Sequence, residues 1–324
     1  MKVLYLIFSH DHQPQVARLA AIIRRLSPGA EIAIHHDPQL ARFDKNLLRD
    51  DWRVHLVPEP IRGEWGGFSL VEQYLHAFRW SIHHLEFDWV VTLTGLTYPI
   101  HPLSGFETML STSGNDGFVY HFDAYDPDHW PPGTAETRFH FRYFRLPKFR
   151  YWHRVPASLR HGLQRCRVWV NAHQPLIRII AHPRGLPTKL GVRRLWLPYG
   201  DRFRLQGGRQ FVNLDTRALR FLLRFVDENP GWTAYMRSSL VPDETFFSSV
   251  LASAAHLSIA NDVQRFIRWP RNVQHAASCA VITADEIPEV VQSTAPFALK
   301  LDSRVDARAL DILDERLRPH LQAI

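Results

Sequence analysis

Two acids stand directly after a proline and directly before an apolar run in residues 239–250, SLVPDETFFSSV. A carboxylate held at a helix start could act as a general base, provided that an acceptor hydroxyl lay within hydrogen-bond reach. The same letters also suit an ordinary helix start: Pro242 has no N–H to lose, and the acids Asp243 and Glu244 complement the positive end of the helix dipole. Taken alone, the stretch predicts a helix N-terminus, so a catalytic role for Glu244 depends on its neighbours.

Two further stretches could bind phosphate. In residues 62–72, RGEWGGFSLVE, the glycines Gly66 and Gly67 would let the backbone approach a ligand at a helix N-terminus, although Gly-Gly before a helix also suits a turn. In FALKLD, Lys300 could supply a fixed cation to a diphosphate, or could be an edge-strand lysine that blunts strand pairing. The segment NDVQRFIRW, residues 261–269, adds further cations in the same part of the chain.

The sequence lacks the motifs of several other classes of enzyme. The sequence holds no HExxH, no Walker loop, no GxGxxG and no GxSxG, which argues against zincins, P-loop enzymes, simple dinucleotide binders and α/β-hydrolases. Asp126 and Asp128 have the DxD spacing of metal-dependent sugar-nucleotide enzymes, but they lie in a polar loop with no apolar strand before it. We therefore predict no metal site there. Cys166 and Cys279 have neither a CxxC nor a zinc spacing.

The composition is that of a globular protein. Of 324 residues, 45% are hydrophobic and 12% aromatic, and no apolar run reaches the ~20 residues of a membrane span. Polar residues 9–12 follow the first apolar run where a signal peptide would place its cleavage site, so we expect a first β-strand and a cytoplasmic chain. The formal charge of +7 favours anionic partners.

The candidate site residues must be positioned by strands and helices. Residues 1–120 alternate short apolar runs with amphipathic segments, which predicts an α/β sheet with parallel strands and ligand residues just after them. Two segments fit that placement, His35-His36-Asp37 and residues 94–99. Strands are expected at 3–8, 31–35, 52–57 and 89–94, and helices at 15–26, 70–84, 216–228, 242–255 and 306–320.

The segment 138–204 differs from its surroundings. It holds sixteen Lys and Arg against one acid, Asp201, interleaved with aromatics and prolines. Such a composition suits a nucleic-acid or anionic membrane surface, and it equally suits an irregular insertion whose charges are simply solvated. Nothing in it matches a known base-reading motif, so we expect no nucleic-acid partner.

Eight blocks, taken in order, resemble the core-2/I-branching glycosyltransferase family, which includes β-1,6-N-acetylglucosaminyltransferases and peptide O-xylosyltransferases. They are VLYLIFSH, IAIHHD, RGEWGGFSLVEQYLHAF, WVVTLTGLTYPI, FVNLDTRALRFLL, PDETFFSSVL, NDVQRFIRW and FALKLD, and they span most of the chain. The resemblance implies a GT-A-like, Rossmann-type mixed sheet flanked by helices, in one domain over 1–324. It would comprise a nucleotide-binding half at 1–120, a basic aromatic insertion at 121–205 and an acceptor and catalytic half at 206–324.

The resemblance also implies an activity: inverting transfer from a UDP-sugar, GlcNAc or xylose, without a divalent metal or other cofactor. It implies that Glu244 is the general base, that Asp37 contacts the uridine, and that Lys300 binds the diphosphate. The residues expected on the UDP side are Asp37, His10, Trp65, Gly66, Gly67, Lys300, Arg271 and Arg268. Those expected on the acceptor side are Asp243, Arg209, Gln210 and Tyr98.

The sequence departs from the family at three places. A second diphosphate arginine is missing from QHAASCAVITADE, for which Arg271, Arg268 or His275 are candidate substitutes. Gly207-Gly208-Arg209-Gln210 replaces the usual Gly-Ser-x-Trp, and TGLTYPI replaces SGQDYPI, so the acceptor can differ. A protein that binds UDP-sugars without catalysis is therefore the first alternative, and a nucleic-acid-binding protein is the second. The lack of the anchor and disulfides of animal relatives fits a bacterial enzyme of surface-polysaccharide synthesis, in the cytoplasm or peripheral at the inner membrane, acting on a glycan or glycolipid.

Overall fold

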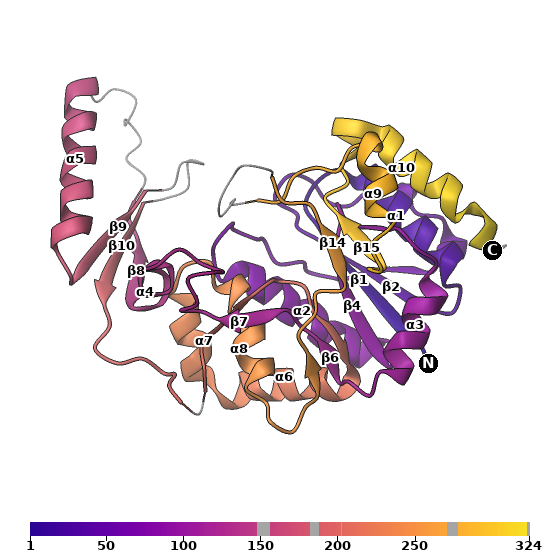
Figure 1. Cartoon of the computed structure of the whole chain (residues 1–324), viewed down its shortest axis with the longest axis horizontal. Helices are drawn as coiled ribbons and strands as arrows, with labels where there is room; N and C mark the ends of the chain where they lie inside the picture. Colours follow the sequence, from indigo (N-terminus) through magenta and orange to yellow (C-terminus); the bar gives the residue numbers. More distant parts are fainter. Residues whose placement is uncertain (148–155, 182–187, 202, 271–277, 323–324) are drawn as a thin grey trace.

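The computed structural model describes residues 1–147, 156–181, 188–201, 203–270 and 278–322. Its centre is a seven-stranded mixed sheet with the strand order β13-β6-β12-β4-β1-β2-β3 (Figure 1). The bounds are β1 Val3–Ser9, β2 Glu31–His36, β3 Val54–Leu56, β4 Trp89–Thr94, β6 Gly117–Phe118, β12 Asn213–Asp215 and β13 Ile259–Ala260. The strands β1 to β4 run parallel, as predicted, whereas β12 runs antiparallel to β4 and β6.

Strand β1 lies inside the sheet between β4 and β2, and every one of its residues is buried. Val3, Tyr5 and Ile7 belong to the core on one face of the sheet, while Leu4 and Leu6 belong to the core on the other face. A strand covered on both faces reads as a continuous apolar run rather than an alternating one, and VLYLIF is such a run.

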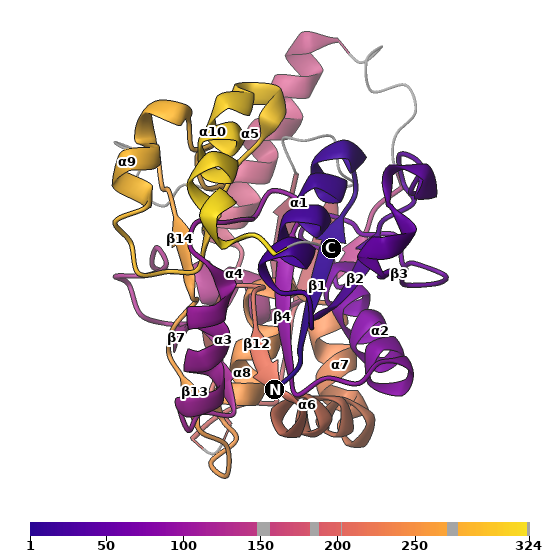
Figure 2. The ribbon, with the colours of Figure 1, turned by 90° about the vertical axis from the view of Figure 1, so that its right-hand side faces the viewer.

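Helices cover both faces of the sheet, as Figure 2 shows. One face packs against α1 Gln13–Leu26, α3 Leu103–Thr112 and α10 Ser303–Leu317. The other packs against α2 Ser69–His84, α6 Thr216–Glu228, α7 Pro230–Arg237 and α8 Phe246–Ala252. The predicted α/β class, a mixed sheet flanked by helices, is confirmed, and the predicted helices exist with shifts of a few residues at their ends.

Short elements complete this body. Two small sheets are β14 Arg265–Ile267 with β15 Phe297–Leu299 and β5 Tyr98–Pro99, and β11 Gln206–Gly208 with β7 His121–Asp123. Short helices are η1 Lys45–Leu47, η2 Asp50–Trp52, α4 Thr134–Phe139, η4 Pro242–Glu244, η5 Ala284–Glu286, α9 Ile287–Val290 and η6 Arg318–His320. Within the described ranges, no helix combines the length and the apolar character that crossing a bilayer requires.

The basic segment is not irregular throughout, contrary to one of its two interpretations. It contains a three-stranded antiparallel sheet in the order β8-β10-β9, formed by β8 Phe141–Arg145, β9 Ile177–Ile180 and β10 Lys189–Arg193. The helix α5 Ala157–His173 packs on β9 and projects at the end of the molecule opposite α10 (Figure 1).

Candidate active site

Glu244 closes the 3-10 helix η4, directly before α8, so the predicted helix start is confirmed with a short turn inserted. Its carboxylate is about a third exposed and forms an ion pair with Arg138, at 2.7 Å between Oε2 and Nη1. Arg138 belongs to α4, and its guanidinium stacks over the ring of Trp130 at 4.4 Å. The stacked and paired arginine thus fixes the direction in which the Glu244 carboxylate points.

The neighbouring acid Asp243 has a different environment. Its Oδ1 is buried and has no hydrogen-bond partner among the described residues. Burial, and secondly repulsion from Glu244, raise the pKa of Asp243 to about 7. Of the two acids in PDET, Glu244 is therefore the one whose carboxylate is both accessible and held by a cation.

Arg209 reaches the same place from β11. Strand β11 lies tightly against its neighbours: a Cβ on Gly208 would stand 2.4 Å from the carbonyl oxygen of Tyr120 and 3.0 Å from Cβ of Ser248. The Ser248 hydroxyl, in α8, donates a hydrogen bond of 2.9 Å to the carbonyl of Gln206. Glycine at position 208 thus brings the strand that carries Arg209 against the helix that follows Glu244.

The Arg209 guanidinium lies among several functional groups. Burial lowers the pKa of Arg209, and the negative charge of Glu244 opposes that change. The guanidinium stacks over Trp269 at 4.3 Å and lies 5.7 Å from the ring of Tyr120. Arg209, expected on the acceptor side, is therefore a neighbour of Glu244, while Gln210 follows it and is half-buried.

Lys300 follows β15, and its Nζ donates a hydrogen bond of 2.5 Å to the Ser278 hydroxyl. Burial raises the pKa of the Cys279 thiol, while the positive charges of Lys300 and Arg209 lower it. Both cations thus lie near the same thiol. Arg209 thus interacts electrostatically with Glu244 and with Cys279, although Arg209 and Lys300 are 91 residues apart by their numbers in the chain.

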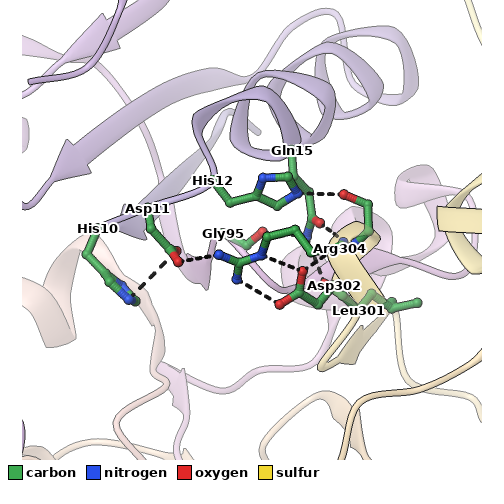
Figure 3. A network of polar contacts seen from close by, with 9 residues as sticks. His10, Asp11, His12, Gln15, Gly95, Leu301, Asp302 and Arg304 are labelled. Atoms are coloured by element: carbon green, nitrogen blue, oxygen red, sulfur yellow. Dashed lines mark hydrogen bonds and ion pairs between the residues drawn. The ribbon is translucent and has the colours of Figure 1, made fainter. Parts of the chain in front are cut away.

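The segment that carries Lys300 is held against the end of β1 by a polar network (Figure 3). The Gln15 side chain donates to the carbonyls of Gly95 and Leu301 at 2.9 and 2.7 Å. Arg304 bridges Asp302 and Asp11, and His10 lies 3.7 Å from Asp11. His10, expected on the UDP side, lies just beyond the carboxyl end of the inner strand β1, and Asp11 connects it to Arg304.

Asp37 follows β2, as the strand-end argument predicts, but its carboxylate is only 5% exposed and is already engaged. It accepts hydrogen bonds from the backbone N–H of Gly63 at 2.6 Å, the N–H of Gln39 at 2.9 Å and the Gln73 amide at 3.2 Å. In this structure Asp37 holds the loop that leads into the Trp65-Gly66-Gly67 turn.

That turn contacts the loop before Glu244. Gly66 has a φ of 65°, a conformation that suits glycine, and its carbonyl accepts a hydrogen bond of 3.2 Å from the N–H of Val241. Trp65 is 41% exposed. The block expected to line the nucleotide pocket and the segment expected to carry the base are therefore joined directly.

Two expected site residues have partners of their own. Tyr98 is completely buried, and its hydroxyl donates to Asp314 of α10 at 2.5 Å, so it cannot contact an acceptor. Arg268 is paired with Glu286 at 3.1 Å and with Glu289 at 2.7 Å. The acceptor role expected of Tyr98 is therefore corrected, whereas the diphosphate role expected of Arg268 stays a prediction.

The second diphosphate cation was sought among three residues, of which Arg271 and His275 lie outside the described residues. Another cation, Arg209, affects the pKa of Cys279 together with Lys300. The DxD acids form a local turn, in which Asp126 accepts from the N–H of Asp128 at 2.9 Å. In the described part of the chain no three His, Cys, Asp or Glu side chains come together as metal ligands would.

Sequence reasoning missed two members of this site. In the sequence, Arg138 is one of many charges in the basic segment, and Trp269 ends the cation-rich segment NDVQRFIRW. A guanidinium that pairs with an acid 106 positions away leaves no local pattern. The one available signal was the lone Trp269 beside Arg268 in an otherwise strand-like run.

Comparisons with known proteins give no family assignment. No family model matches the chain, and no curated protein matches it. Among solved structures, mouse xyloside xylosyltransferase 1 overlaps 92% of this chain and 97% of its own, at 12% identity and a TM-score of 0.38. S. aureus TarS 1-349, solved with UDP-GlcNAc, overlaps 37% of this chain and 34% of its own, at 11% identity and a TM-score of 0.28. HddC from Yersinia pseudotuberculosis overlaps 38% of this chain and 60% of its own, at 14% identity and a TM-score of 0.26. At such identities and TM-scores these neighbours do not assign a function to this chain.

Proposed function

We propose that the protein is a glycosyltransferase that moves a sugar from a UDP-sugar to a hydroxyl of a glycan or lipid-linked acceptor, with inversion at the anomeric carbon. The observation that carries the proposal is the placement of Glu244 beside Arg138 and Arg209, with Lys300 reached through the Cys279 neighbourhood. Of these residues, Glu244 and Lys300 come from blocks that resemble the core-2/I-branching family, whose GT-A-like organisation we propose for this chain.

In the proposed reaction Glu244 removes the proton from the acceptor hydroxyl, whose oxygen attacks the anomeric carbon on the face opposite UDP. The bond between that carbon and the β-phosphate oxygen breaks, and its electron pair leaves on UDP. A base on the attacking side allows attack and proton removal to occur together. Arg138 orients the Glu244 carboxylate through the ion pair described above.

The departing diphosphate accumulates negative charge, which preorganised cations stabilise. Lys300 is the proposed first cation, and Arg209 is a candidate for the second. We propose that these cations replace the divalent metal that other sugar-nucleotide enzymes use. GlcNAc and xylose are the proposed donor sugars, on the resemblance alone, and surface-polysaccharide synthesis in bacteria is the proposed setting.

The test is a UDP-release assay on the purified protein with EDTA present, using UDP-GlcNAc, UDP-xylose, UDP-glucose and UDP-galactose in turn. The Glu244→Gln variant is expected to lose about 10²- to 10⁴-fold in turnover, because it removes a general base and keeps the shape of the side chain. Glu228→Gln, an exposed acid in α6, is the matched control and is expected to turn over like the wild type. Full turnover in Glu244→Gln would contradict the assignment of the base.

If UDP is released from none of the four donors, two explanations are open, and calorimetry with UDP separates them. UDP binding without turnover, even when acceptor glycans are supplied, would favour a sugar-nucleotide-binding protein that lacks catalysis. Absence of UDP binding would refute the proposed function altogether.

A further inference from the structure

The end of the molecule that α5 and β9 form carries large apolar side chains in solvent. Trp169 is 60% exposed, Leu176 55%, Trp196 73% and Leu195 fully. Strand pairing and a 2.8 Å hydrogen bond from the N–H of Arg193 to the carbonyl of Leu176 bring the end of β10 beside the start of β9. We call these four residues the apolar tip.

The loop after β10, which carries Leu195 and Trp196 of the apolar tip, is well fixed at Arg194. Arg194, the residue before Leu195, turns inward, donating to the Tyr235 carbonyl at 3.0 Å and the Ser238 hydroxyl at 2.8 Å. Its guanidinium also stacks over the Tyr235 ring at 4.0 Å. The contacts of Arg194 therefore hold the adjacent Leu195 and Trp196 in solvent, where two large apolar side chains stay in contact with water.

The chain segment that carries the apolar tip holds many arginines and no acid. No Asp or Glu occurs between positions 138 and 200. Exposed arginines described in this region are Arg142, Arg145, Arg160, Arg165 and Arg193, of which Arg145 pairs with Glu64. A partner surface with negative charge would complement these arginines. To cover Leu195 and Trp196, the same partner surface must also accept apolar side chains.

A bilayer with anionic lipid meets both requirements. Tryptophan concentrates at the level of the headgroups, leucine enters the acyl boundary, and arginine binds lipid phosphates. Single-stranded nucleic acid fits the arginines and Trp196 but not Leu195, because bases stack on aromatic rings and gain little from an aliphatic side chain. We propose that the apolar tip docks the protein on an anionic membrane surface, with Leu195 and Trp196 entering the headgroup region. This surface is separate from the proposed catalytic residues and does not depend on their assignment.

Co-sedimentation of the full-length protein with vesicles tests the proposal. Vesicles of phosphatidylcholine alone are compared with vesicles in which about a third of the lipid is phosphatidylglycerol, at low and at high salt. We expect binding to be at least about tenfold tighter on the anionic vesicles, and to weaken with salt, since arginine contacts to lipid phosphates are electrostatic.

Variants assign the binding to the apolar tip. Leu195→Ala with Trp196→Ala is expected to lower the partition coefficient about tenfold or more, because the buried apolar area is lost. The matched control is Leu40→Ala with Ile312→Ala, which are 69% and 43% exposed elsewhere on the protein. Urea midpoints equal to the wild type confirm that both double variants are folded.

Three outcomes would overturn the proposal: no binding to either vesicle, equal loss in the control variant, or full binding by the Leu195 and Trp196 variant. A labelled single-stranded oligonucleotide is measured in parallel. The proposal would also be overturned if the protein bound the oligonucleotide through Trp196 and did not bind vesicles. That result would assign the surface to nucleic acid.

Discussion

Arg138 and Glu244, 106 positions apart in the chain, meet in an ion pair of 2.7 Å. Arg138 comes from α4 at the edge of the basic segment, and Glu244 from the turn before α8. The segment that looked like an insertion thus supplies the partner of the proposed base. Stacking on Trp130 limits the freedom of the arginine, so the geometry of the carboxylate depends on both residues.

Replacing Arg138 is expected to impair turnover without abolishing UDP binding. In Arg138→Ala the Glu244 carboxylate loses its orienting partner, and a displacement of about 1 Å can cost on the order of 10²-fold in rate. Steady-state UDP release gives kcat and KM separately, and the loss should appear in kcat. Arg138→Lys should recover part of the rate, while Arg142→Ala, an exposed arginine of β8, should have little effect. A full rate in Arg138→Ala would show that the ion pair does not position the base.

Lys300→Ala is expected to weaken UDP binding by roughly 10- to 100-fold, because a hydrogen bond to a charged group contributes about 1.5–3 kcal/mol. Calorimetry with UDP measures the change, and added salt should weaken wild-type binding more than that of the variant. The control is Lys45→Ala, an exposed lysine of η1. Unchanged affinity in Lys300→Ala would remove Lys300 from the diphosphate site.

Asp243 makes the stability of the protein depend on pH. Burial and the Glu244 charge raise its pKa in the folded state to about 7, above the value near 3.8 expected for the unfolded chain. Below the unfolded pKa the carboxyl is neutral in both states, and stability is then lost as the pH rises through the folded pKa, between about 4 and 7, by at most about 1.4 kcal/mol per pH unit. Water that reaches the accessible part of Asp243 reduces this amount.

The Asp243→Asn variant removes this titration. We expect its free energy of unfolding, from urea titrations at pH 5, 6, 7 and 8, to fall less with pH than that of the wild type. Glu228→Gln, again the exposed acid of α6, should follow the wild-type curve. Parallel curves for Asp243→Asn and the wild type would mean that the buried carboxyl does not titrate in this window.

Tyr98→Phe separates a packing role from an acceptor role. The variant loses the hydrogen bond to Asp314, which should lower the free energy of unfolding by about 1 kcal/mol, while Arg18 still pairs with Asp314 at 2.6 Å. Because Tyr98 is buried, KM for the acceptor should not change. A raised acceptor KM at unchanged stability would restore the acceptor role expected from the sequence.

Much of the fold was predictable from the sequence because burial leaves a local record. The continuous apolar run of β1, the strand at Trp89–Thr94 and the amphipathic helix α6 each reveal their state through the period of their own residues. The position of Glu244 at a helix start was readable for the same reason, since proline and acids act on the turn that they occupy.

The tertiary structure alone decided which side chains meet. Tyr98 and Arg268 looked available in the sequence, and the fold commits them to Asp314 and to two glutamates. Arg138 looked like one charge among many, and the fold makes it the partner of Glu244. The spacing of apolar residues within an element shows whether that element has a buried face. Contacts between distant elements depend instead on how the chain connects them. The sequence by itself therefore determined the elements and the proposed base, whereas the packing of those elements determined the cations around it.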